Sequence, residues 1–177
     1  MIKSANKISI IGGSGTGKTT LADNFGKKLN LPVCHIDGIH HLENWKQRDK
    51  MQRDEMILQK VNEDKWIIDG TYSSTLTQRL EAADLIIYLD YSSLAQIIGV
   101  MRRFIRHHGK EKKEIPGCKE QMTFKFFIWV CNWRKNKRNS IIEKISKIDK
   151  NKVLIFKNRK KLNKWYYKNF NEKIEIN

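Results

Sequence analysis

The sequence contains few of the residues that mark secreted, disulfide-linked proteins. It has three cysteines in 177 residues, Cys34, Cys118 and Cys131, and no two of them form a Cys-x-x-Cys pair. An odd number of cysteines at irregular spacing argues against a disulfide framework and indicates a reducing compartment. The opening residues, MIKSANKISIIGG, have too short an apolar stretch for a signal peptide, so we expect a cytoplasmic protein.

Long apolar runs are equally scarce. The longest candidate, residues 126–131, lies between Lys125 and Asn132 and falls far short of the about 18 residues that span a membrane. We therefore expect no membrane partner. Prolines number only two, and the sequence has no internal repeat, low-complexity segment or Pro/Gly-rich linker. With 40% hydrophobic residues the chain can bury a substantial core, so we expect one domain over residues 1–177.

Positive charge is unevenly distributed along the chain, whose formal net charge is +16. Residues 1–100 carry 12 Lys and Arg against 12 Asp and Glu, whereas residues 101–177 carry 23 against 7. This excess indicates an anionic partner for the C-terminal half, either nucleotide phosphates or a nucleic-acid backbone. A lysine-rich solvated surface explains the same charge equally well, so charge alone identifies no partner.

Short runs rich in Ile, Val and Leu alternate with helix-like segments, which is typical of a parallel sheet covered on both faces. The predicted strands are residues 8–11, 33–36, 66–68, 85–89 and 153–156. Apolar residues at helical spacing predict helices over residues 21–29, 51–61 and 94–105. Residues 107–123 fit neither pattern. The sequence therefore predicts an α/β fold with five strands.

The segment IIGGSGTGKTT follows the first predicted strand and opens the first predicted helix. It fits G-x-x-x-x-G-K-[ST], and it fits the dinucleotide pattern G-x-G-x-x-G less well. Glycines permit positive φ angles and a close approach of the backbone, so that successive N–H groups and the helix N-terminus face a phosphate. We expect a nucleoside triphosphate to bind here. The predicted contacts are Gly12, Gly13, Ser14, Gly15, Thr16, Gly17, Lys18, Thr19 and Thr20.

Two residues of this segment and one later carboxylate have predicted chemical roles. Lys18 is expected to reach the β- and γ-phosphates, and the Thr19 hydroxyl to bind Mg²⁺. Asp69 ends the apolar run WIID and is the expected metal partner, acting through a water molecule. An Asp-Gly turn is the alternative for Asp69-Gly70. Because Gly70, and not Glu, follows Asp69, the pattern favours phosphoryl transfer over hydrolysis.

The segment VCHIDGIHHLENW places Asp37 just beyond the second predicted strand, at the edge of the sheet where ligands bind. Asp37 is therefore the candidate that binds the acceptor or takes its proton, with an Asx turn as the alternative. Cys34 and the nearby histidines match no zinc-ligand spacing, so we predict no zinc site. Trp45 is either a packing residue or a stacking surface for the acceptor.

Two arginine pairs flank the unassigned stretch. Arg102 and Arg106 lie four residues apart near the end of one predicted helix, and Arg134 and Arg138 repeat that spacing on the next. Such pairs suit a lid, over about residues 102–138, that closes on a triphosphate, supplies positive charge and excludes water. Solvated helix faces in a basic region are the alternative.

Several segments together carry a resemblance over nearly the whole chain: IGGSGTGKTTLA, HIDGIHHLENW, WIIDGTYSSTLTQRLEAADLIIYLD, RRFIRHHGK, TFKFFIWVCNW and VLIFKNRKKL. The chain resembles the bacterial DNA topology modulation proteins, which look like small P-loop kinases of the adenylate kinase-like group. The resemblance implies a three-layer P-loop NTPase fold with strand order 2-3-1-4-5, a helical lid after the fourth strand, and ATP with Mg²⁺. It also implies that Arg159, within the last of these segments, contacts the nucleotide.

The sequence departs from adenylate kinases directly after Asp69-Gly70. Those enzymes continue with Phe-Pro-Arg, where this chain has Thr71-Tyr72-Ser73, so the arginine that grips a monophosphate is missing and Arg79 is the candidate substitute. Two hypotheses stay open. The favoured one is a kinase acting on a nucleotide, nucleoside or other small acceptor. The alternative is an ATP-binding regulatory protein that associates with DNA through its basic half, although the sequence has no helix-turn-helix, zinc-finger or RNP-type motif.

Overall fold

The computed structural model describes residues 2–175 and contains a five-stranded parallel sheet in the order β2-β3-β1-β4-β7. The strands are β1 Lys7–Gly12, β2 Val33–His35, β3 Trp66–Asp69, β4 Leu85–Leu89 and β7 Val153–Phe156. The predicted order is confirmed, since β5 and β6 belong to a separate hairpin and the fifth strand of the sheet is β7. The second strand ends one residue earlier than predicted, because Ile36 begins a short helix.

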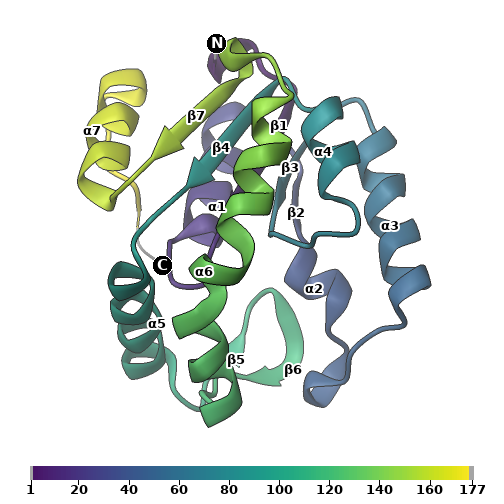
Figure 1. Ribbon diagram of the computed structural model, residues 1–177, viewed down its shortest axis with the longest axis vertical. Coiled ribbons are helices and arrows are strands. Elements are labelled where there is room, and N and C mark those ends of the chain that lie inside the picture. Colours follow the sequence, from purple (N-terminus) through teal and green to yellow (C-terminus); the bar gives the residue numbers. More distant parts are fainter. Residues whose placement is uncertain (1, 176–177) are drawn as a thin grey trace.

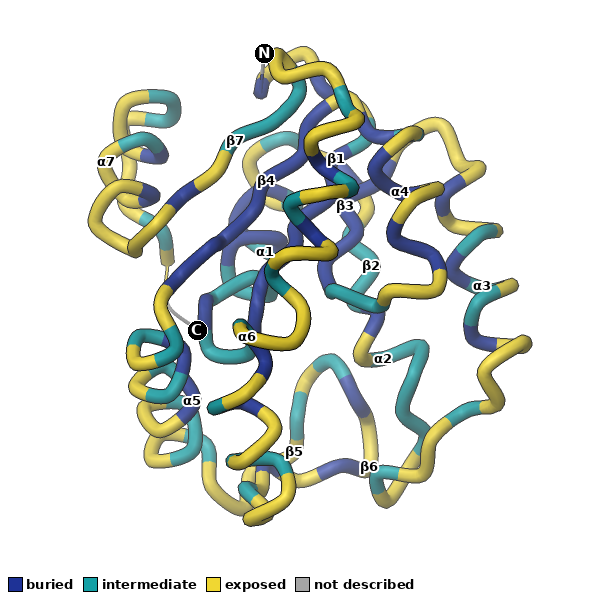
Figure 2. Tube along the Cα trace, in the orientation of Figure 1, coloured by how far each residue is buried: buried dark blue, intermediate teal, exposed yellow. Residues whose placement is uncertain are grey.

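Helices cover both faces of the sheet, as the apolar pattern of the strands predicts (Figure 1). Side chains alternate along each strand, so Ile87 and Leu89 of β4 face one core while Ile86 and Tyr88 face the other. The first core is closed by α1 Lys18–Leu29 and α7 Arg159–Phe170, and the second by α3 Lys50–Asn62, α4 Leu76–Ala82 and α6 Phe124–Ser146. The central strands β1, β3 and β4 form the buried centre of the molecule (Figure 2).

The remaining helices are α2 Ile36–His40, α5 Ser93–His107 and the short 3-10 turns η1 Ile2–Ser4, η2 Glu43–Trp45 and η3 Lys150–Lys152. Side-chain oxygens begin several of the helices: Ser92 accepts a hydrogen bond from a backbone N–H at the start of α5, and Thr123 does the same for α6. Within residues 2–175, no helix is both long and apolar enough to cross a membrane.

Residues 107–123, for which the sequence predicts no element, contain an antiparallel hairpin of β5 Glu111–Lys112 and β6 Ile115–Lys119. The hairpin lies between α5 and α6 in the chain and packs against η2 (Figure 1). The backbone N–H of Trp45 donates to Cys118 Sγ at 3.1 Å, and its indole Nε1 donates to the Lys119 carbonyl at 3.1 Å. The predicted lid region therefore touches the segment that follows β2.

Candidate active site

The phosphate-binding motif occupies the turn between β1 and α1, as predicted. Gly12, Gly15 and Gly17 have φ angles of 152°, 74° and 89°, which side chains rarely tolerate. Thr16 is buried and its hydroxyl donates to the Gly13 carbonyl at 2.9 Å, so it stabilises the loop from inside. Among the described residues, no side chain caps the start of α1. Its first N–H groups are therefore available to an anion.

The loop rests directly on α5. A Cβ atom on Gly15 would overlap the backbone of α5 at Gln96, and one on Gly99 would overlap the backbone oxygen of Gly15. Glycine is required at both positions because the two main chains lie in contact. The motif predicts the first of these glycines, but no sequence pattern identifies Gly99.

Lys18 lies over the loop at the head of α1. Its Nζ donates to the Gly13 carbonyl at 2.9 Å. Burial lowers the pKa of the Lys18 ammonium below its ordinary value, while the carboxylates of Asp37 and Asp69 act in the opposite direction. The loop lysine, the predicted metal carboxylate and the predicted acceptor carboxylate are therefore close enough to affect one another's charge.

The predicted metal residues meet across the sheet edge. The Thr19 hydroxyl donates to Asp69 Oδ2 at 3.1 Å, and Asp69 is buried at the end of β3. A hydroxyl and a carboxylate are hard oxygen ligands of the kind that Mg²⁺ binds. No cluster of three or more His, Cys, Asp or Glu suited to a metal occurs within residues 2–175. The donor set fits Mg²⁺, which takes most of its ligands from phosphate and water.

His35 holds the other oxygen of Asp69, and sequence reasoning missed this contact. Its Nδ1 lies 2.6 Å from Asp69 Oδ1 and its Nε2 lies 3.1 Å from Asp23 Oδ1. Burial alone would lower the pKa of the imidazole, but Asp69 and then Asp23 raise it to about 9. The parallel register of β2 and β3 places His35 beside Asp69. The sequence signal for this contact was that the two residues end neighbouring strands.

The predicted acceptor carboxylate lies in α2. The side chain of Asp37 is exposed, and its Oδ1 accepts a hydrogen bond from the Tyr72 hydroxyl at 3.0 Å. Desolvation would raise the pKa of Asp37, but Lys18, Lys112 and the Tyr72 hydrogen bond bring it below its ordinary value. Desolvation and the neighbouring Asp37 raise the pKa of the Tyr72 hydroxyl, so it remains a donor. The carboxylate is ionised and held in one orientation.

Four half-buried rings form a continuous row beside Asp37. Ring centroids of Tyr72 and His40 are 4.9 Å apart, those of His40 and His41 4.4 Å, and those of His41 and Trp45 5.2 Å. Burial lowers the pKa of His40 to about 4, with His41 and Arg53 acting in the same direction. His40 is therefore neutral at neutral pH. His40 and His41, for which the sequence predicts no role, belong to this row. Trp45 lies at the end opposite Tyr72.

Two arginines border the same region, and both are engaged by the protein. Arg53 of α3 donates from Nε and Nη2 to Asp54 Oδ1 at 2.8 and 2.6 Å, and from Nη2 to Ser74 Oγ at 3.1 Å. Arg79 is fully buried and donates to the carbonyls of Gly70 and Tyr72 at 2.8 and 3.0 Å. The expectation that Arg79 replaces the monophosphate-gripping arginine is wrong, because its guanidinium holds the loop after β3 from inside.

The first predicted lid pair lies on the outer side of α5. Arg102 and Arg106 are exposed, and neither has an ion pair within the described residues. Arg103 faces inward instead, where its Nε donates to the buried Glu120 Oε1 at 2.9 Å. Arg103 and Lys112 both lie near enough to Lys18 to lower its pKa, after the larger effect of burial. The catalytic roles of Arg102 and Arg106 stay predictions.

The second predicted pair is tied to Asp90, the residue after β4. Arg138 Nε lies 3.0 Å and Arg134 Nη2 3.4 Å from Asp90 Oδ1, and Lys157 Nζ lies 2.9 Å from Oδ2. Desolvation would raise the pKa of Asp90, but Arg138 and Lys157 bring it below its ordinary value. These contacts fix α6 to the end of β4. Whether the same arginines also act on phosphate remains a prediction.

Arg159, at the start of α7, lies beside the phosphate loop. Its Nη2 would be 3.2 Å from a Cβ atom on Gly17, so the guanidinium borders the loop on the side of α7. This position agrees with the nucleotide contact that the resemblance implies, which nevertheless stays a prediction. Ser14 and Thr20 are half-buried near the loop.

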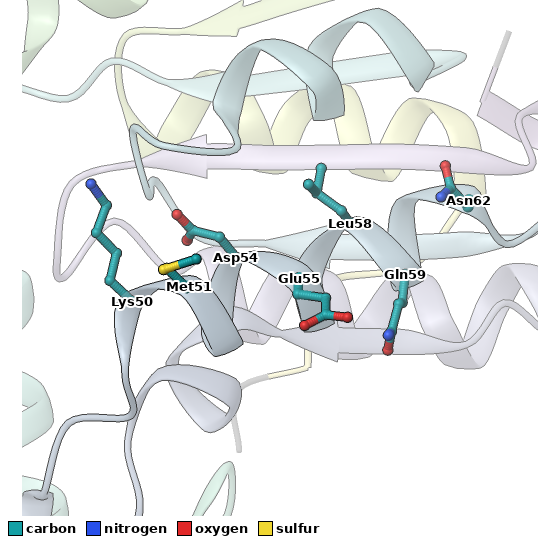
Figure 3. Close-up of a pocket in the computed structure, with 7 residues that line it drawn as sticks. All are labelled: Lys50, Met51, Asp54, Glu55, Leu58, Gln59 and Asn62. Atoms are coloured by element: carbon teal, nitrogen blue, oxygen red, sulfur yellow. The ribbon is translucent and has the colours of Figure 1, made fainter.

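A surface hollow lies along α3, and the Asp54 that pairs with Arg53 is part of its lining (Figure 3). It is lined by Lys50, Met51, Asp54, Glu55, Leu58, Gln59 and Asn62. All of these residues come from one helix, and none is a predicted site residue. The chemistry of the phosphate loop therefore lies elsewhere.

Comparisons with known proteins agree on the fold. No protein-family model matches the chain, and no curated protein sequence matches it. Shikimate kinase from Acinetobacter baumannii, solved in complex with shikimate, is 13% identical, with a TM-score of 0.53 over 97% of this chain and 98% of that one. A gluconokinase from Sinorhizobium meliloti 1021 is 13% identical, with a TM-score of 0.50 over 87% and 83%. The chain has the fold of small P-loop kinases.

Proposed function

We propose that this protein is an ATP-dependent phosphotransferase that moves the γ-phosphoryl group to a small acceptor. The convergence of three features around Lys18 carries the proposal. The phosphate loop supplies Lys18 itself, Asp69 with Thr19 forms the metal pair, and Asp37 is a separate ionised carboxylate nearby. A binding protein that only senses ATP has no need of the third feature.

Each part has a distinct task. The N–H groups of the loop and of the first turn of α1 bind the phosphates, with Lys18 on the β- and γ-phosphates and Arg159 beside them. Mg²⁺, when held by Thr19 and by Asp69 through water, neutralises phosphate charge. Arg103 and Lys112 add positive charge from α5 and the hairpin. Gly38, next to Asp37, packs against the Glu114 carbonyl of the hairpin, which brings the hairpin beside the acceptor carboxylate.

In the transfer step, the acceptor oxygen forms a bond to the γ-phosphorus while the bond from that phosphorus to the β,γ-bridging oxygen breaks. ADP leaves, and the proton of the acceptor hydroxyl passes to the carboxylate of Asp37 and then to solvent. Tyr72 keeps that carboxylate in place through its hydrogen bond. The cytoplasm, a compartment that contains ATP, remains the predicted location.

The test of this proposal is Lys18→Ala. Calorimetric titration with Mg·ATP is expected to show affinity reduced by roughly 100-fold, because the lysine charge on the phosphates is lost. Lys27→Ala is the matched control, since Lys27 lies on the same helix and forms only a surface ion pair with Glu175. Thermal unfolding checks that both variants fold. Equal Mg·ATP affinity in Lys18→Ala and the unsubstituted protein would contradict the proposal.

A second candidate function rests on the basic C-terminal half. Several exposed lysines of α7, Lys160, Lys161, Lys164 and Lys168, are unnecessary for binding one triphosphate. These lysines can make weak, nonspecific contacts with nucleic-acid phosphates. The resemblance to DNA topology modulation proteins is the reason to test for such contacts. The same lysines serve equally as a solvated surface, so we rank this function second.

A further inference from the structure

The geometry points to an acceptor that is an uncharged ring compound with a free hydroxyl, a sugar or a nucleoside, and to the Arg53–Asp54 pair as the feature that excludes its anionic counterparts. This inference rests on the proposed phosphotransferase function. Three independent features of the acceptor side support it: the carboxylate, the engaged cations and the row of rings.

The carboxylate of Asp37 is suited to a hydroxyl and unfavourable to an anion. One oxygen accepts from Tyr72 at 3.0 Å, and Oδ2 has no partner among residues 2–175. The exposed side chain therefore has an oxygen available to accept a substrate O–H. A phosphate or carboxylate at the same distance would meet a fixed negative charge, which repels it.

Cations that border this region are engaged by protein groups. Phosphate esters and carboxylates are usually gripped by arginines with free N–H donors. The Arg53 guanidinium spends its Nε and Nη2 donors on Asp54 and Ser74, and its carbon lies 5.2 Å from the centre of the Tyr72 ring. Arg79 is buried, and Lys112 lies 3.4 Å from the carboxylate of Glu120.

The rings supply the remaining contact surface. Tyr72, His40, His41 and Trp45 are each half-buried, and the row they form borders Asp37. Aromatic faces pack against the flat surface of a base or the C–H surface of a sugar, with no charge on the ligand. A carboxylate that can accept a hydrogen bond from a hydroxyl lies here beside an aromatic surface. These groups together suit an uncharged ring compound.

Paired acceptors test the inference. A panel of nucleosides with their 5′-monophosphates, and of sugars with their phosphates and acids, is supplied with saturating Mg·ATP while ADP release is followed. In each pair that reacts, we expect kcat/KM to be at least about tenfold higher for the uncharged member. Faster reaction of the anionic members overturns the inference, as does a panel without any reaction in protein that binds Mg·ATP. Failure to bind Mg·ATP overturns the proposed function instead.

Asp54→Asn then tests the cause, because it frees Arg53. We expect the preference for the uncharged member to fall about tenfold, since the guanidinium can then attract an anion. Glu55→Gln is the matched control: it removes the same charge from the next residue of α3, is exposed, and has no ion pair within the described residues. Thermal unfolding confirms that Asp54→Asn folds. An unchanged preference in folded Asp54→Asn overturns the assignment to the Arg53–Asp54 pair.

Discussion

The phosphate loop of residues 12–17 is shaped by its main chain, whereas the acceptor side is assembled from side chains on α2, α3 and the segment after β3. In the loop, positive φ angles and contact with α5 set the geometry, so few side chains are needed. On the acceptor side, Asp37, Tyr72, His40 and Arg53 hold one another through hydrogen bonds and ring contacts. Backbone recognition suits phosphate, which this fold binds in many proteins, and side-chain recognition allows the acceptor to vary.

The largest expected effect separates the two regions by removing the acceptor carboxylate. In Asp37→Asn we expect phosphoryl transfer to slow by on the order of 100-fold or more, because no group remains to take the acceptor proton. Mg·ATP affinity should stay within a few-fold, measured by calorimetry. Asp64→Asn, an exposed carboxylate without a hydrogen bond or ion pair in the described chain, is the control. A large loss of Mg·ATP affinity in Asp37→Asn would remove the separation.

Asp69→Asn is expected to act on the nucleotide side alone. The amide cannot supply the negative charge that faces Thr19, so the Mg²⁺ concentration needed for half-maximal activity should rise roughly 10- to 100-fold. Titration of activity with Mg²⁺ at fixed ATP measures this change. If Asp69→Asn and Asp37→Asn show the same Mg²⁺ dependence, the two carboxylates do not have separate tasks.

A smaller effect concerns the lid. Sequence reasoning expects Arg102→Ala and Arg106→Ala to slow transfer, but Arg103, paired with Glu120, is the member of this group whose charge acts on Lys18. We expect Arg103→Ala to reduce kcat/KM by up to roughly 100-fold and the other two variants to reduce it less. Glu120→Gln breaks the same ion pair and keeps the arginine charge, so it is the control. The reverse ranking would restore the lid proposed from the sequence.

The smallest effect tests the basic half. Filter binding to duplex DNA should detect weak, nonspecific association at low salt that falls steeply as salt rises, because each neutralised phosphate releases a counterion. Mg·ATP should change this affinity little. Lys161→Gln with Lys164→Gln should lower the salt slope, since both lysines are exposed on α7. Specific binding that survives physiological salt and responds strongly to ATP would favour the DNA-associated function over the kinase.

The parts of the molecule that follow local rules were predictable from the sequence. The phosphate loop is a contiguous motif, and the strands are short apolar runs whose order the resemblance supplied. The position of Asp69 was predictable because it ends a strand, and the structure places it beside Thr19, while its role at a metal stays a prediction. The expected contact of Arg159 agrees with its position beside Gly17.

Other features depend on elements that are distant in sequence, and the sequence could not reveal them. An arginine on a short amphipathic helix can face either way, and only the packed fold shows that Arg79 faces inward. His35 contacts Asp69, which is 34 residues away in the sequence. Arg53 contacts its neighbour Asp54 and also Ser74, which is 21 residues away. The hairpin of residues 111–119 was missed because a two-residue strand has no apolar alternation to detect.

The contact between Gly99 and the loop at Gly15 has a consequence for the evolution and engineering of this chain. The two positions are 84 residues apart, yet neither accepts a side chain unless both main chains separate. The hairpin of residues 111–119 follows α5 in the chain and takes no part in this contact. The turn of α5 that carries Gly99 accepts no side chain at that position. Gly99 lies outside every recognised motif, yet it is constrained as tightly as the glycines of the phosphate-binding motif.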